Sequence, residues 1–253
     1  MQPRKRCLTL AQIKAKGKLV VGIYGDDPYF SYINTSTNKL EGFDIDIARA
    51  IAKEILGDPG KIEFVTVTTP NRIDFLRDGT VDLVVAELSI TKEREHLIDF
   101  SSIYYVAGQS VLVKDSSPLY NLEDLDNKSI GVLDASTNVS RIEQLLPQSK
   151  FVYFESIGQG FKALDEDKIQ AFSIDDVMLL AFKAHPQRFH KNYRFIGGEI
   201  ALESYGIGVR KGCTELLNAI NQALAKIRSD GTWQKIYDAN IGQISQISAH
   251  PPE

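Results

Sequence analysis

The sequence predicts an α/β protein built from two similar units that lie side by side. Three observations support this fold class. Short β-branched stretches alternate with segments whose apolar residues recur every three or four positions, and this alternation occurs twice, before and after about residue 105. Strands that alternate with helices are typical of parallel sheets with helices on their faces. At 253 residues, the chain is long enough for two lobes of roughly 100 residues each.

The first half of the chain contains a β-α-β-α-β pattern. The expected elements are strands over residues 18–23, 62–67 and 81–86 and helices over residues 44–56 and 71–77. Thr69 followed by Pro70 predicts the start of the second helix, because threonine is a good N-cap and proline is tolerated at the first helical position. The Gly-Asp-Asp-Pro cluster at residues 25–28 ends the first strand and predicts a loop after it.

The second half repeats the alternation. The expected elements are extended stretches over residues 105–113, 129–133, 151–154, 169–174 and 204–210 and helices over residues 138–146, 157–164, 176–184, 214–228 and 232–238. The sequence does not determine which unit the last two helices join. Two α/β units side by side leave a cleft between them, and small ligands usually bind in such clefts.

Composition excludes several classes of protein. No stretch approaches the roughly 20 apolar residues that a membrane-spanning helix needs. With 29 Lys and Arg against 33 Asp and Glu, the formal net charge is -4, so we expect no nucleic acid partner. The only two cysteines, Cys7 and Cys213, match no metal-ligand spacing, so we expect no metal site and no cofactor, and they form a disulfide or stay unpaired. The N-terminal residues lack an apolar signal-peptide core, so a signal peptide is missing or has been removed.

Several separated motifs occur in an order typical of one family. The main motif is Asp-Leu-Val-Val-Ala-Glu-Leu-Ser-Ile-Thr-Lys-Glu-Arg at residues 82–94, followed by Ile-Asp-Phe-Ser at 98–101. The supporting motifs are Leu-Glu-Gly-Phe-Asp-Ile-Asp at 40–46, Asn-Arg-Ile at 71–73, Gly-Thr-Val-Asp at 79–82, Asp-Gly-Thr-Trp at 230–233 and Ile-Tyr at 236–237. With these motifs, the chain resembles the type II extracellular solute-binding proteins of polar amino acid ABC importers, of the glutamate, aspartate and glutamine type.

This resemblance implies a two-lobed fold of the periplasmic-binding-protein type II class, with two strands that cross between the lobes. Lobe 1 would comprise residues 1–107 and 202–253, and lobe 2 residues 108–201. The resemblance also implies a monomer in the periplasm or on the extracellular surface. Such a protein captures an acidic or polar L-amino acid between its closing lobes, and the closed form is recognised by the membrane subunits of an ABC permease.

Arg94 is the first residue expected to hold such a ligand. Its planar guanidinium can bind a carboxylate through two parallel hydrogen bonds, and it matches the family's carboxylate-binding arginine, although by itself it would be interpreted as a solvated arginine in a charged run. The resemblance also assigns ligand contacts to Ser89, Ser136 and Thr137. The last two precede a predicted helix, whose unpaired N–H groups favour an anion, but either hydroxyl could simply cap that helix. Ala135 replaces a glycine of the family, which is tolerable if its φ is negative.

Asp175 follows a predicted strand and matches the family's aspartate that accepts the ligand ammonium group. Its neighbour Asp176 is the competing choice, because it would lie at the N-terminus of the next helix, where a carboxylate is favourable in any case. We expect Asp175 to be the ligand-binding residue of the two. The ammonium acceptor would then come from lobe 2 and the carboxylate-binding guanidinium from lobe 1.

The residues that would recognise the ligand side chain give conflicting indications. Arg72 matches a position that contacts the side-chain carboxylate in glutamate- and aspartate-binding members, whereas Tyr24 stands where several such members have a basic residue. Glu87 stands where the family often has a small residue, and its burial would be costly unless it pairs with Arg72 or with a cationic ligand. The first pairing suits a polar neutral or acidic ligand, and the second suits arginine or lysine. Tyr29 is a candidate for an aromatic wall along the ligand, whereas Phe30 is expected in the core.

Two further functions use the same fold. A few relatives resemble dehydratases of cyclic acids such as cyclohexadienyl dehydratase, and this chemistry needs a general acid at the ligand. Glu87 is the only unusual carboxyl candidate, and the four histidines belong to no nucleophile-base motif, so the chain is not expected to be an enzyme. A sensor ectodomain of a receptor or channel is the other alternative, and it would require a transmembrane helix in the full-length protein.

Overall fold

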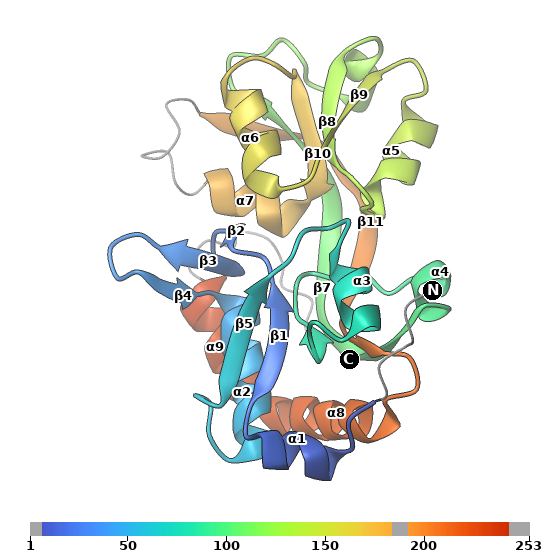
Figure 1. The fold of residues 1–253 in the computed structure, drawn as a ribbon. Coiled ribbons are helices and arrows are strands. Elements are labelled where there is room, and N and C mark those ends of the chain that lie inside the picture. The colour runs from blue at the N-terminus through green and yellow to red at the C-terminus, as the bar shows by residue number, and fades with distance from the viewer. Residues whose placement is uncertain (1–6, 184–191, 243–253) are drawn as a thin grey trace.

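The computed structural model describes residues 7–183 and 192–242 and has a mixed α/β fold in two groups of elements (Figure 1). We call the lower group in Figure 1 lobe 1 and the upper group lobe 2. An 8-stranded sheet runs through both in the order β5-β1-β6-β11-β7-β10-β8-β9. Its central strands, β7 (Ile98–Lys114) and β11 (Tyr193–Arg210), form a long antiparallel pair that extends from one lobe into the other. The predicted α/β fold class with two lobes is confirmed.

Lobe 1 is built around β1 (Leu19–Ile23), which pairs in parallel with β5 (Ile62–Thr66) on one side and β6 (Leu83–Val84) on the other. Its helices are α1 (Leu10–Lys16), α2 (Phe43–Leu56), α3 (Arg72–Asp78), α4 (Lys92–Glu95), α8 (Thr214–Ser229) and α9 (Thr232–Asn240). The apolar face predicted for α2 is buried in the core. The C-terminal helices α8 and α9, which the sequence did not assign to a unit, pack against α2 in lobe 1.

Lobe 2 contains β8 (Ser129–Leu133) between β9 (Lys150–Phe154) and β10 (Ala171–Asp175), all parallel. Its helical elements are the 3-10 helix η1 (Leu122–Leu125), α5 (Asn138–Leu145), α6 (Ile157–Asp165) and α7 (Asp176–Lys183). The last residue predicted for the helix over 176–184 lies outside the described residues. Because β1, β6, β8 and β10 all end toward the other lobe, the loops after these strands meet between the lobes.

Three local predictions of secondary structure differ from what the structure shows. The residues after β1 form a small 3-stranded antiparallel sheet of β2 (Asp26–Asp27), β3 (Ser31–Asn34) and β4 (Lys39–Glu41) instead of a loop. Helix α3 has Asn71 rather than Thr69 at its N-cap. The hydroxyl of Thr69 lies 2.9 Å from the hydroxyl of Tyr24, so a tertiary hydrogen bond takes the place of the predicted cap. The predicted strand over 81–86 is also shorter in the structure, since β6 spans Leu83–Val84 alone.

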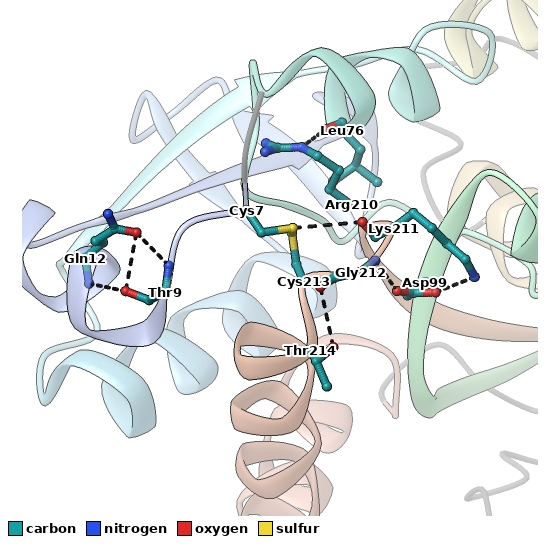
Figure 2. Close-up of a disulfide and its surroundings, with 10 residues drawn as sticks. All are labelled: Cys7, Thr9, Gln12, Leu76, Asp99, Arg210, Lys211, Gly212, Cys213 and Thr214. Carbon is teal, nitrogen blue, oxygen red and sulfur yellow. Dashed lines mark hydrogen bonds and ion pairs between the residues drawn. A yellow bond between two sulfur atoms is a disulfide. The ribbon is translucent and has the colours of Figure 1, made fainter. Parts of the chain in front are cut away.

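Cys7 and Cys213 form a disulfide, the first of the two alternatives that the sequence left open (Figure 2). The disulfide joins the segment before α1 to the N-cap residue of α8. Next to it, the N–H of Gly212 donates to the carboxylate of Asp99 at 2.7 Å, and Lys211 forms an ion pair with the same carboxylate at 2.5 Å. The start of the described chain is therefore covalently linked to lobe 1. No helix within the described ranges has the length and apolar character needed to cross a membrane.

Candidate functional site

Residues from both lobes meet around the side chain of Arg94, which is buried in α4 just after β6. Its Nη1 donates to the backbone carbonyl of Ser89 in lobe 1 at 2.9 Å, and its Nη2 donates to the carbonyl of Ala135 in lobe 2 at 3.0 Å. The hydroxyl of Thr137 lies 3.3 Å from the hydroxyl of Ser89 and donates to Glu203 on β11 at 3.0 Å. The structure thus brings Arg94, Ser89 and Thr137 together, as the sequence predicted.

The electrostatic environment of Arg94 favours an anion. Burial, followed by the nearby positive charge of Arg72, lowers the pKa of its guanidinium to about 10. A guanidinium with that pKa stays charged at neutral pH, so a carboxylate beside it would gain from both cations. The two guanidiniums therefore form a desolvated positive region between the lobes.

The N-terminus of α5 faces the same region, and its side chains are not used for capping. Thr137 occupies the N-cap position, but its side chain makes no capping hydrogen bond, so the simple capping role considered for it is wrong. The Ser136 hydroxyl is buried without a hydrogen-bond partner among the described residues. Ala135 has φ of +56°, so the negative φ that was the condition for tolerating alanine there is absent. This left-handed conformation explains why a glycine would be the easier residue there.

Asp175 is the buried carboxylate at the end of β10, and it belongs to a polar network. It accepts a hydrogen bond from Asn138 Nδ2 at 2.8 Å and another from the hydroxyl of Tyr205 on β11. Burial, followed by the charge of Glu203, raises the pKa of Asp175 to about 7. The neighbouring Asp176 instead accepts the backbone N–H of Gly108 at 3.1 Å and thereby joins α7 to β7. Of the two aspartates, Asp175 is the one in the network beside Arg94.

Arg72 is occupied by protein groups in a way that the sequence did not predict. Its Nη1 donates to the Tyr24 hydroxyl at 2.7 Å and to the backbone carbonyls of Ala86 at 2.5 Å and Glu87 at 3.3 Å. Arg72 therefore contacts the backbone of Glu87 and not its carboxylate, so the first of the two pairings that the sequence left open for Glu87 is not formed. Within the described part of the chain, no N–H or hydroxyl donor reaches either carboxylate oxygen of Glu87.

Asp27, a residue that the sequence analysis did not single out, lies beside Glu87. Both oxygens of Asp27 are likewise buried with no N–H or hydroxyl donor among the described residues, and the carboxyl of Asp27 is hydrogen-bonded to that of Glu87. Burial and the neighbouring Asp27 raise the pKa of Glu87 well above its usual range, and burial raises the pKa of Asp27 to about 8. The only indication in the sequence was the Asp26-Asp27 pair directly after the first strand. Asn138 was missed as well, because an asparagine at a helix start is common.

Tyr29 lies in the turn between β2 and β3, with a half-buried side chain and φ of +70°. Its carbonyl accepts the backbone N–H of Phe43 at 2.7 Å and so joins the turn to α2. Phe30 is buried in the core as predicted, in edge contact with Phe43 and Tyr105. The aromatic-wall role of Tyr29 stays a prediction.

A groove of about 710 Å³ opens between the lobes at Arg94. Its lining includes Arg94, Ser136, Thr137, Arg141 and Glu203. The groove lining supplies the Arg94 guanidinium, the free Ser136 hydroxyl and the N-terminus of α5, while Arg72 and the buried Asp175 lie behind this lining and act on Arg94 electrostatically. Cationic and carboxylate groups from the two lobes match the two charged groups of a small zwitterion. The fold and the site together define a two-lobed ligand-binding protein.

The chain belongs to the family of bacterial extracellular solute-binding proteins, family 3, which matches residues 19–243. It is 39% identical over 230 residues to the ABC transporter glutamine-binding protein GlnH of Bacillus subtilis (strain 168), covering 90% of this chain and 83% of that protein. Among solved structures, it is similar to the solute receptor for L-cysteine of Neisseria gonorrhoeae, with TM-score 0.89, 29% identity and coverage of 96% and 98%. It is also similar to an ancestral arginine-binding protein bound to glutamine, with TM-score 0.82, 37% identity and coverage of 89% and 98%.

Proposed function

We propose that this protein is the substrate-binding subunit of an amino acid ABC importer and that its substrate is L-glutamine. The observation that supports this most directly is the convergence of Arg94 from lobe 1 and Asp175 from lobe 2 on one buried polar region. A free amino acid has a carboxylate and an ammonium group on the same carbon. Complementary charges from opposite lobes can bind both groups only when the lobes are closed, so the ligand stabilises closure.

The ligand carboxylate would lie between Arg94 and the N-terminus of α5. Arg94 would supply two charge-assisted hydrogen bonds, and the hydroxyls of Ser89, Ser136 and Thr137 would supply further donors. The first N–H groups of α5 have no partners inside the helix, so they add a favourable site for an anion. Of these groups, the buried Ser136 hydroxyl has no hydrogen-bond partner among the described residues and is therefore available to a ligand.

The ligand ammonium group would bind Asp175. The carboxylate of Asp175 is oriented by Asn138 and Tyr205, and its raised pKa reflects burial without a compensating cation. A bound ammonium group would supply that cation and return the pKa of Asp175 toward its ordinary value. The ligand would therefore relieve an unfavourable charge arrangement of the ligand-free protein.

Glutamine is favoured over glutamate by the acidic surroundings of the site and by the glutamine-binding relative. Burial disfavours the charged forms of the carboxyls at Asp27, Asp44 and Glu87, and a second carboxylate on the ligand would be disfavoured in the same surroundings for the same reason. The same carboxyls favour a cationic side chain, so arginine is the second candidate. We further propose a monomer outside the cytoplasmic membrane that delivers its ligand to ABC permease subunits, without catalysis or a cofactor, and with lobe boundaries near residues 107 and 202. The relative on which this rests is named an ABC transporter glutamine-binding protein.

Calorimetric titration of the purified protein with each of the twenty L-amino acids tests this function. We expect L-glutamine to bind and Arg94→Ala to weaken its binding by about 2–5 kcal/mol, roughly 30-fold or more, because the carboxylate loses its charged partner. Arg77→Ala is the matched control, since this exposed arginine lies on α3, pairs with Asp74 and does not line the groove. Equal glutamine affinity of the Arg94→Ala and wild-type proteins would remove the assignment.

A further inference from the structure

Two buried carboxyl groups, those of Asp27 on β2 and Glu87 after β6, form an unusual pair in lobe 1. Asp27 has no exposed surface and Glu87 is 2% exposed. The two carboxyls are hydrogen-bonded to each other, and no N–H or hydroxyl donor among the described residues reaches any of their oxygens. Leaving buried acceptors unsatisfied is costly, so such groups usually have a partner that is supplied from elsewhere.

The groups around this pair do not supply that partner. The carboxyls of Asp26, Asp44 and Asp175 all act on the pair with the same negative sign. Asp44 is already bound by the hydroxyl of Tyr104 at 2.9 Å and by the backbone N–H of Glu87 at 3.3 Å.

The nearest cation does not neutralise the pair either. The guanidinium of Arg72 is directed to the Tyr24 hydroxyl and to backbone carbonyls. In the described ranges, no three His, Cys, Asp or Glu side chains are grouped so that they could hold a metal ion. The partner that the structure leaves open is therefore a donor-bearing group on the ligand itself.

The pair is also close to the proposed ligand. Asp175, the proposed ammonium acceptor in lobe 2, is among the charges that act on both Asp27 and Glu87. The pair comes from lobe 1, on the loops that follow β1 and β6 and meet lobe 2. An amino acid held by Arg94 and Asp175 would therefore extend its side chain toward the pair.

We propose that the Asp27–Glu87 pair binds the end of the ligand side chain and that its proton content selects the ligand. With one proton shared between the two carboxyls, the pair accepts the N–H donors of an uncharged carboxamide. With both carboxyls ionised, it accepts an ammonium or guanidinium group. This inference rests on the proposed function, because it concerns the side-chain end of the same amino acid site.

Proton linkage distinguishes the two kinds of ligand. A cationic side chain replaces the shared proton and releases it to solvent, whereas a carboxamide leaves the proton in place. The raised pKa of both groups means that the shared proton is still bound at neutral pH. The affinity for a cationic amino acid should therefore rise with pH relative to the affinity for glutamine. Asp175 also titrates in this range, but it binds the ammonium group of both ligands, so its effect cancels in the ratio of affinities.

The test is calorimetry of the wild-type protein with L-arginine and L-glutamine between pH 6 and pH 8 in buffers of different ionisation enthalpy. We expect the ratio of arginine to glutamine affinity to rise by up to about tenfold per pH unit, with proton release on arginine binding alone. In the double variant Asp27→Asn, Glu87→Gln the ratio should be independent of pH, because no carboxyl is left in the pair to hold a proton. Glu63→Gln, which changes an exposed glutamate on β5, should keep the wild-type slope.

The outcomes separate this inference from the proposed function. Glutamine binding with a constant ratio of affinities in the wild-type protein would overturn the inference and leave the proposed function intact. The same slope in the double variant as in the wild type, or wild-type protein that fails to bind arginine at any pH in the range, would also overturn it. Failure of every free amino acid to bind would overturn the proposed function and the inference together. Circular dichroism of the double variant checks folding, which should survive because the change removes two buried acids.

Discussion

Asp26 on β2 makes a direct contact between the lobes, and its removal should shift the balance between open and closed forms. Its Oδ2 accepts the backbone N–H of Gly158 at 3.1 Å. Gly158 lies in the first turn of α6, where the N–H groups have no partners inside the helix, and the helix dipole favours a negative charge there. A charge-assisted hydrogen bond contributes about 1.5–3 kcal/mol when buried, and partial exposure of Asp26 reduces this to about 1 kcal/mol.

The free energy of the Asp26–Gly158 hydrogen bond predicts a measurable change in ligand affinity. The contact exists only when the lobes are together, so Asp26→Ala should weaken the closed form by about 1 kcal/mol, a factor of roughly five in the closure equilibrium. A ligand that binds the closed form then loses up to the same factor in apparent affinity. Asp26→Asn should have a smaller effect, because its amide oxygen still accepts the N–H without a full charge.

Two measurements check this prediction. Calorimetry with L-glutamine should give the graded loss of affinity, and small-angle scattering of the ligand-free protein should give a larger radius of gyration for Asp26→Ala than for the wild type. Asp74→Ala is the control, since this exposed aspartate lies on α3 and pairs only across its own helix with Arg77. A ligand-free radius and a glutamine affinity equal to those of the wild type would refute the role of the Asp26–Gly158 contact.

Three further predictions concern stability. Cys7→Ser should lower the free energy of unfolding by about 2–5 kcal/mol, because it opens a disulfide that closes most of the chain into one loop. In urea denaturation, a reductant should destabilise the wild-type protein by the same amount and leave Cys7→Ser unchanged. Ala135→Gly should raise the free energy of unfolding by about 0.5–1 kcal/mol, since the φ of +56° at this position favours glycine. A lower free energy of unfolding in urea denaturation would contradict the strain argument. The ligand-free protein should lose stability as pH rises from about 4 to about 8, because the folded state holds protons on Asp27, with pKa about 8, and on Asp44 and Asp175, with pKa about 7, that the unfolded chain releases near pH 4. Thermal denaturation at pH 5 and pH 8 measures this difference, and a higher midpoint at pH 8 would show that the sign is wrong.

The elements that the sequence predicted well are those with strong local signals. The helix α2 follows from apolar residues at helical spacing, and β1 and β8 follow from short β-branched runs. The small sheet of β2, β3 and β4 was missed because its strands have 2, 4 and 3 residues, too few to establish an alternating pattern. Thr69 was misassigned as a cap because the sequence gives no sign of its hydrogen bond to Tyr24.

The sequence by itself determined the α/β alternation and the positions of Arg94 and Asp175 directly after strands, because these depend on residues that are neighbours along the chain. Only the tertiary structure decided how those side chains are used. It directed Arg72 to Tyr24 and to backbone carbonyls, and it placed Asp27 beside Glu87. The partners of a buried charge come from distant segments that folding brings together, so no local pattern in the sequence specifies them.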